Sequence, residues 1–463
     1  MMKKKNVLLG FFILISSIVA TPLFAAYNRL GIPDSSEIRK QIIETWLTAP
    51  LSYVRNNLPE VIYNDNGQPF EVRLEESEET YHIFVAPQAK MNVSVYSDTG
   101  MTIEEKIIYP GDACGSWVLI KDKKTDKPLR IRYYFLKDSE VYIQFTPEGK
   151  TSLVDLVIFD NYASRGVPTG VPFEKFYTAS IEDAIRYTEN KIHWEYVTYD
   201  TDMYHSIKQM IAVIREKIPY IVMVDDAMYD ENNELVHIST GKKFNDYELG
   251  ELSKKNEKSL SLSSAGFVKW IGDGLIEPLT GGLLKRKPLL RQTVEVKNTG
   301  HIGVLEQKYD LFFSLNWIRN LASAIISVYS GSVYPFNEAG VDVTINPFAS
   351  SISDKGITNT VTYIKDSGYT IGVLKSLLYV LASTEPGTFY FGAIRGTDRT
   401  VTPEIKAFNE CVAFFPYFQD DGGFDCVVFM NGRELSLDDF CLLNQDNFVF
   451  LTRAKASEMF FPY

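Results

Sequence analysis

Residues 259–271 read "SLSLSSAGFVKWI", in which small side chains lead into Gly266-Phe267-Val268. Ser263 and Ser264 are both candidate N-caps, so the pattern predicts a helix over 262–275. A side chain at such a start lies near the positive end of the helix dipole and near free backbone N–H groups. The stretch therefore predicts either a nucleophile at Ser264 or a capped structural helix with close packing at Gly266.

These two alternatives differ in the chemistry that they require. A thiol at a helix N-terminus becomes a thiolate readily, because the local positive potential lowers its pKa. A serine hydroxyl gains much less, because its alkoxide is far too basic to be populated by such a shift. Ser264 could act as a nucleophile only beside a general base.

The segment Ser263–Val268 resembles the nucleophile helix of the NlpC-type, papain-like peptidoglycan hydrolases, which begins Asp-Cys-Ser-Gly-Phe-Val. Three of the six positions are identical, and the family's aspartate and cysteine are replaced by Ser263 and Ser264. The resemblance implies a papain-like α+β domain that is degenerate at its catalytic positions.

The resemblance also implies a histidine on a strand after the helix, and two segments compete for that place. One is "NTGHIGVLE", which carries His301. The other is "GGFDCVVFMNGREL", where Phe424 or Asp425 takes the histidine's position. We favour the second, because a terminal sheet would complete the fold around a helical insertion near 305–385. Both the cysteine and the histidine would then be lost.

The N-terminus has the pattern of a secretory signal peptide over residues 1–26. Lys3, Lys4 and Lys5 precede an uncharged apolar run, and small residues offer cleavage after Ala25 or Ala26. The pattern predicts export to the periplasm or cell surface. An uncleaved segment would instead serve as a membrane anchor.

The charge of the chain argues against two classes of partner. There are 47 basic and 59 acidic residues; without the three N-terminal lysines, 47 − 3 = 44 basic residues remain and the formal charge is −15. Nucleic acids and anionic membrane surfaces both require a basic face, so neither is expected. For Cys114, Cys411, Cys426 and Cys441 we expect buried free thiols, or at most one C-terminal bridge.

The patterning along the chain predicts an α+β protein of two domains. After a helix that starts near Asp34, seven short period-two segments predict an antiparallel β-sandwich or barrel over residues 27–165. A Gly- and Pro-rich segment at 160–175 marks the boundary. Helices and strands then mix over 176–463, the papain-like α+β domain. The expected helices are 181–191, 203–217, 262–275, 311–328 and 371–381, and the expected strands are 220–223, 341–345, 388–394 and 426–430.

Two local patterns have specific meanings in this second domain. Asn431-Gly432 between apolar runs predicts a tight type I′ hairpin. In 311–328, an apolar stretch is interrupted by Asn316, Arg319 and Asn320, which share a helix face. Such a stripe is typical of a buried hydrogen-bond network, and it could alternatively line a cleft beside Ser264.

No metal or cofactor is predicted. None of the five histidines is three or four residues from another, and the HExxH, GxSxG and phosphate-loop motifs are absent. The segment Asp225–His237 has only a superficial likeness to a calcium loop, so we expect a solvated acidic hairpin.

The sequence as a whole favours an exported, non-catalytic cell-envelope protein that binds peptidoglycan peptides or a protein partner. The first alternative is an active cell-wall hydrolase or acyltransferase that uses Ser264 with His301. The second is a structural envelope protein without enzyme ancestry.

Overall fold

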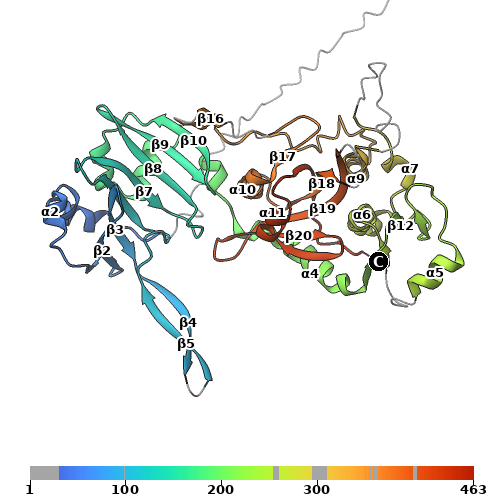
Figure 1. The fold of residues 1–463 in the computed structure, drawn as a ribbon, viewed down its shortest axis with the longest axis horizontal. Coiled ribbons are helices and arrows are strands. Elements are labelled where there is room, and N and C mark those ends of the chain that lie inside the picture. Colours follow the sequence, from blue (N-terminus) through green and yellow to red (C-terminus); the bar gives the residue numbers. More distant parts are fainter. Residues whose placement is uncertain are drawn as a thin grey trace, which may run out of the picture.

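The computed structural model describes residues 31–97, 100–253, 260–294, 310–349, 351–353, 356–358, 363–399 and 404–462. Two lobes lie side by side, one built on each of two large antiparallel sheets (Figure 1). Helices accompany both sheets, so the predicted α+β class is confirmed.

The first lobe contains one eight-stranded antiparallel sheet in the order β1-β2-β3-β6-β7-β8-β9-β10. Its strands are β1 (Glu60–Tyr63), β2 (Pro69–Glu76), β3 (Thr80–Pro87), β6 (Trp117–Asp122), β7 (Pro128–Tyr134), β8 (Val141–Glu148), β9 (Thr151–Ile158) and β10 (Asn161–Pro168). The order follows the chain apart from the β4–β5 insertion, as expected for strands joined by short turns.

Helices cover the apolar face of this sheet. Alternate side chains such as Ile83, Leu119 and Ile143 are fully buried, and they pack with Ile38 and Trp46 from the N-terminal segment. The covering elements are α1 (Ser36–Gln41), η2 (Ile43–Leu47), α2 (Leu51–Val54), η3 (Phe173–Tyr177) and α3 (Ile181–Thr188). Apart from the β4–β5 insertion, the described strands of this lobe thus form a single helix-covered sheet, whereas the sequence predicted a β-sandwich or a barrel. Alternating apolar residues indicate that one face of a strand is buried, but they do not indicate whether helices or a second sheet cover that face.

The Gly- and Pro-rich segment is part of the first lobe. Strand β10 pairs with β9 through two register shifts, and Gly166 takes a φ of +59° between Ser164 and Val167. These irregularities account for the interrupted sequence pattern, because a bulge inserts residues that break the alternation. Further on, Phe176 stacks on Phe145.

The first lobe also extends past the predicted boundary. Trp194, in the short helix η4 (Trp194–Val197), packs edge-on against Phe135. The packing therefore places the end of this lobe near residue 197, beyond the boundary predicted at 160–175.

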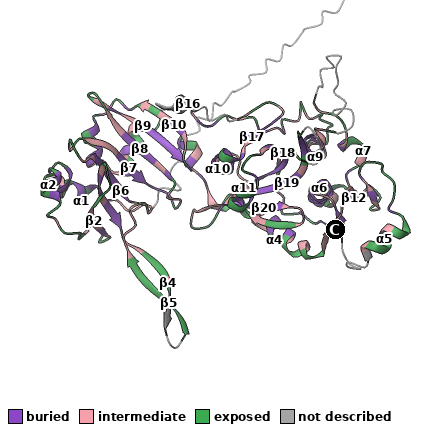
Figure 2. Cartoon of the chain, in the orientation of Figure 1, coloured by how far each residue is buried: buried purple, intermediate pink, exposed green. Residues whose placement is uncertain are grey.

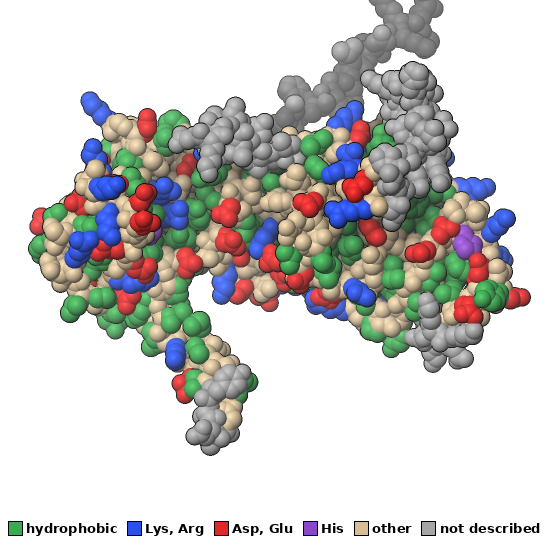
Figure 3. Space-filling model, viewed as in Figure 1, with side chains coloured by type: hydrophobic (Ala, Val, Ile, Leu, Met, Phe, Trp, Pro, Cys, Tyr) green, Lys and Arg blue, Asp and Glu red, His purple; other side chains and the backbone are tan. Residues whose placement is uncertain are grey.

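A two-stranded arm projects from the first lobe. It consists of β4 (Ala89–Ser97) and β5 (Gly100–Ile108), and it stands clear of the body of the protein (Figure 1). Most of its residues are exposed, as the green ribbon in Figure 2 shows. Its exposed apolar side chains include Met91, Ile103 and Ile107. Figure 3 shows hydrophobic side chains, in green, along this arm.

The second lobe is built on a six-stranded antiparallel sheet in the order β17-β22-β18-β19-β20-β21. The strands are β17 (Tyr369–Thr370), β18 (Thr388–Asp398), β19 (Ile405–Phe418), β20 (Phe424–Met430), β21 (Arg433–Ser436) and β22 (Phe448–Lys455). Asn431 and Gly432 connect β20 to β21 with φ of 50° and 63°, which confirms the predicted tight hairpin.

Helices pack on both faces of this sheet. One face presents Phe391, Ala413 and Phe429 to a core with α4 (His205–Lys217), α6 (Ser264–Thr280) and α9 (Phe313–Ser330). The other face presents Val412 and Val428 to α10 (Leu374–Thr384) and α11 (Leu437–Leu443). Because successive residues of each strand are buried on opposite faces, the strands read as continuous apolar runs.

Smaller elements complete this lobe. They are η5 (Thr201–Tyr204), η6 (Ile218–Tyr220), β11 (Ile221–Met223), β12 (Ala227–Tyr229), β13 (Leu235–His237), α5 (Asp246–Ser253), β14 (Leu260–Leu262), α7 (Arg286–Leu289) and η7 (Ile371–Val373). The paired strands β15 (Ser351–Ser353) and β16 (Gly356–Thr358) instead follow a segment that runs beside β10 of the first lobe, where the Ala349 backbone N–H donates to the Tyr162 carbonyl at 2.8 Å (Figure 1). Strands β12 and β13 form the predicted acidic hairpin.

One expected strand differs from the structure. Residues 341–345 form only an isolated bridge between Asp342 and Thr452. Val341 and Val343 are nevertheless buried, which explains the alternating pattern that predicted a strand.

The two lobes share one hydrophobic core. Phe159 of the first lobe packs against Tyr379 of α10 and Phe424 of β20. The side chain of Asn161 donates to Ser376 at 2.7 Å across the same junction. The lobes are therefore joined by packed side chains as well as by the chain itself.

All four cysteines are free, as the sequence favoured. Cys411 and Cys426 are buried, and Cys114 and Cys441 are half-buried. Within the part of the chain that the structure describes, no helix combines the length and hydropathy needed to cross a bilayer.

Candidate functional site

Ser264 is the first residue of α6, and the N-cap of this helix is its neighbour Ser263. The Ser263 hydroxyl accepts from the Gly266 backbone N–H at 3.1 Å and donates to the Ala227 carbonyl oxygen at 3.1 Å. The capping role that the sequence left open between the two serines thus belongs to Ser263. The Ser264 side chain is free for another role.

Close packing against the backbone explains why a glycine stands at position 266. A Cβ built on Gly266 would lie 2.3 Å from the Ala227 carbonyl oxygen, a distance that a side chain cannot occupy. Phe267 and Val268 are fully buried, and the Trp317 indole N–H donates to the Ala265 carbonyl at 2.9 Å. Packing in this fold therefore explains each of the three residues that are identical to the hydrolase pattern, Gly266, Phe267 and Val268.

The side chain that accompanies Ser264 is Glu410 on β19. Burial raises the pKa of the Glu410 carboxyl, and interactions with Asn431 and then with the Ser264 hydroxyl counteract part of that rise. One carboxylate oxygen, Oε2, is buried and has no hydrogen-bond partner in the described structure. The helix start thus brings together a hydroxyl, a carboxyl of raised pKa and the Asn431 side chain.

Asp425, another predicted site residue, does not join this group. Asp425 lies at the N-terminal end of β20, where it pairs with Tyr417 of β19. Its carboxylate accepts a hydrogen bond from the Tyr417 hydroxyl at 2.8 Å. Tyr417 is seven positions from Glu410 along β19, so roughly 20 Å of strand separates Asp425 from the Ser264 neighbourhood. His301 lies outside the described residues.

Sequence reasoning missed Glu410 and Asn431. Glu410 stands inside "AFNECVAFF", where a single charge interrupts a run of apolar residues, and this interruption was the available signal. The pairing with Ser264 could not be anticipated, because it depends on how α6 crosses the sheet.

The polar stripe on α9 forms a structural network. Arg319 is buried and pairs with both Asp342 and Asp366, at 2.9 Å in each case. Asn316 accepts from the backbone and the hydroxyl of Thr293, at 2.8 Å each. These contacts support the buried-network interpretation of the stripe.

No group of three or more metal-ligating side chains is present among the described residues. In the acidic hairpin, His237 stacks on Phe244 and lies 3.5 Å from carboxylate oxygens of both Asp226 and Glu248. Asp226 lies beside the Nδ1 atom of the His237 ring, and Glu248 lies beside its Nε2 atom.

Replacing Glu410 by glutamine should change how stability depends on pH. The folded-state pKa of Glu410 lies above its ordinary value, so ionising this carboxyl costs folded-state stability. Wild-type stability should therefore fall as pH rises from about 4.5 through the folded-state pKa, and this contribution should vanish in Glu410→Gln. Urea unfolding between pH 4 and pH 8 would measure the difference.

Glu404→Gln is the matched control, because Glu404 is an exposed carboxyl that precedes the same strand. Parallel pH profiles for the wild type and Glu410→Gln would contradict the expectation.

Comparisons with known proteins cover only part of the chain. The model of a domain of unknown function, DUF8515, matches residues 28–196. No curated protein and no solved structure matches the chain. The matched segment coincides with the first lobe as packing defines it, including Phe176 and Trp194 beyond the last strand of the sheet.

Proposed function

We propose that this protein is an exported, non-catalytic binding protein of the cell envelope, whose second lobe is a degenerate papain-like domain. The observation that carries the proposal is that the ionisable side chain beside Ser264 is the carboxyl of Glu410, where the family has an imidazole. A serine at a helix start needs a base that is unprotonated and within hydrogen-bond reach. An ordinary carboxylate is a weaker base than an imidazole, so this contact falls short of the serine–imidazole pair that such chemistry uses.

The position of α6 agrees with a papain-like ancestry. This helix packs against β12 and the central strand β19 of an antiparallel sheet. By the resemblance of Ser263–Val268, its first residue Ser264 would stand where the family has its cysteine. The ligand would be peptidoglycan peptides or an envelope protein. This part of the proposal rests on the resemblance of Ser263–Val268 and on the signal peptide predicted over residues 1–26.

A second candidate is a hydrolase in which Glu410 accepts the Ser264 proton. The specific observation in its favour is the Ser264–Glu410 interaction itself, with Asn431 as a further contact of the carboxyl. A carboxylate of raised pKa is a stronger base than an ordinary carboxylate, so this chemistry does not require an imidazole. The cell-wall hydrolase or acyltransferase that uses Ser264 with His301 is a further alternative.

The deciding prediction concerns Ser264→Ala. Because the proposed function has no nucleophile, we expect peptidoglycan fragments and p-nitrophenyl acetate to be turned over no faster by the wild type than by this variant. Co-sedimentation with purified peptidoglycan should be equal for both proteins. Ser263→Ala is the matched control for folding, and it should lose about 0.5–2 kcal/mol of stability because it removes the cap.

Other outcomes would identify the rival. Turnover that disappears in both Ser264→Ala and Glu410→Gln would establish the hydroxyl–carboxyl pair. Turnover that disappears in Ser264→Ala and His301→Ala would establish the imidazole instead. In each case the variant must still unfold in a single cooperative transition, so that the loss of turnover does not reflect a loss of folding.

A further inference from the structure

A cavity of about 100 Å³ lies alongside α6, away from the sheet. Its walls come from α6, from β14, from the β12–β13 hairpin and from the C-terminal tail. The α6 residues Gly266, Lys269, Asp273 and Glu277 are three or four apart, so the cavity follows one face of the helix.

Lys269 is the most buried polar side chain that lines this cavity. Lys269 is only 1% exposed, and its Nζ donates to Asp273 Oδ2 at 2.6 Å. An ammonium carries three donors, and this is the single acceptor that the described residues give it. Asp273 is fully engaged, because its other oxygen accepts the Leu284 backbone N–H at 2.8 Å. Donors left unpaired at such depth are costly, so they favour an acceptor in the cavity.

The charges around the cavity favour a neutral acceptor. Asp273 already balances the Lys269 charge, and Glu277 at the wall and nearby Asp230 add negative charge. A bound carboxylate would therefore place a surplus anion beside acidic groups. A bound cation would face the ammonium. A carbonyl oxygen meets neither penalty.

The remaining walls are mostly apolar. Leu260, Leu262, Trp270 and Phe461 line the cavity, together with the ring of Tyr229. Such walls favour a methyl or a similar small apolar group beside the carbonyl.

We infer that this cavity binds the acetamido group of a small ligand, with its carbonyl oxygen on Lys269 and its methyl group against the apolar wall. The group could belong to an N-acetylated amino sugar or to an N-acetylated peptide. The site uses neither Ser264 nor Glu410, so the inference stands whether or not the second lobe is catalytic.

The test uses the full chain and two probes, N-acetylglucosamine and N-acetyl-alanine methylamide. Glucosamine and acetate are the matched controls, since each lacks the neutral acetamido group. Saturation-transfer NMR and shifts of the unfolding midpoint should detect at least one probe and neither control. Binding of the sugar alone or of the peptide alone would identify the source of the group.

Lys269→Met should weaken probe binding by about 10- to 100-fold, because it removes charged hydrogen-bond donors. Lys285→Met, an exposed lysine just beyond the helix, should bind like the wild type. Leu283→Trp fills the cavity and leaves the ion pair intact, so it tests the site even if Lys269→Met fails to fold. The inference is overturned if neither probe binds, if acetate binds as well as the probes, or if Leu283→Trp binds them unchanged.

Discussion

Replacing Arg319 by methionine should lower the free energy of unfolding by about 3–5 kcal/mol. The guanidinium lies inside the second lobe, where it pairs with Asp342 and Asp366 and lies over the Phe450 ring at 4.5 Å. Its removal leaves two carboxylates close together with no compensating cation. Breaking a buried pair by deleting one partner is costly for this reason, even where the intact pair contributes little net stability.

The network also connects elements that are distant in the sequence. Arg319 belongs to α9, and Asp342 lies in the segment that forms a bridge to β22. Urea unfolding of Arg319→Met at pH 7 measures the expected loss. Lys365→Met is the control, because Lys365 is exposed beside Asp366 and should change stability by at most about 0.5 kcal/mol. A loss below 1 kcal/mol in Arg319→Met would contradict the assignment.

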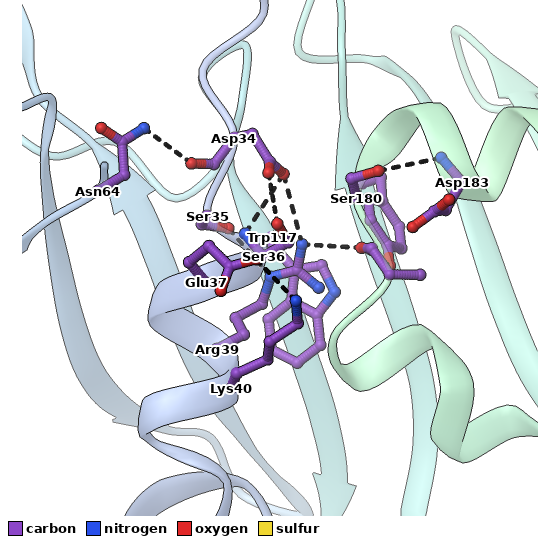
Figure 4. A network of polar contacts seen from close by, with 12 residues as sticks. Asp34, Ser35, Ser36, Glu37, Arg39, Lys40, Asn64, Trp117, Ser180 and Asp183 are labelled. Carbon is purple, nitrogen blue, oxygen red and sulfur yellow. Dashed lines mark hydrogen bonds and ion pairs between the residues drawn. The ribbon is translucent and has the colours of Figure 1, made fainter. Parts of the chain in front are cut away.

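Replacing Arg39 by methionine should lower the free energy of unfolding by about 2–4 kcal/mol. Figure 4 shows this side chain between α1 and the chain that follows η3, beside Trp117. Its guanidinium donates at 2.9 Å to the carbonyls of Tyr177 and Ala179, and its centre lies 5.0 Å from the Trp117 ring. Methionine can fill part of the space, but it leaves the Tyr177 carbonyl without a donor.

The chain itself offers a control for this experiment. Lys40 is the next residue and forms an exposed ion pair with Glu37 at 2.6 Å (Figure 4). Such surface pairs contribute about 0–1 kcal/mol, so Lys40→Met should be nearly neutral. Similar stability losses in Arg39→Met and Lys40→Met would show that Arg39 does not hold α1 to the 177–179 segment.

The Arg39 contacts also explain the extent of the first lobe. They join a helix at the start of the matched segment 28–196 to residues near its end. A strand pattern ends where the sheet ends, and it carries no information about the segments that cover the sheet. The boundary predicted at 160–175 therefore fell before the residues that complete the core.

The sequence by itself determined the features that depend on local patterning. Period-two runs located seven strands of the first lobe, the Asn431-Gly432 pair fixed the β20–β21 turn, and helical spacing located α6 and α9. The same spacing identified the stripe with Arg319, because residues three and four apart share a helix face. These features follow from interactions within a few residues of the chain.

The tertiary structure alone decided which side chains meet. Ser264 and Glu410 are far apart in the sequence, and they meet because α6 begins over β19. Asp425 lies about seven residues further along the sheet than Glu410, because the strand register pairs Asp425 with Tyr417. No local pattern encodes the crossing of a helix over a sheet, so the partner of Ser264 could be found only in the folded chain.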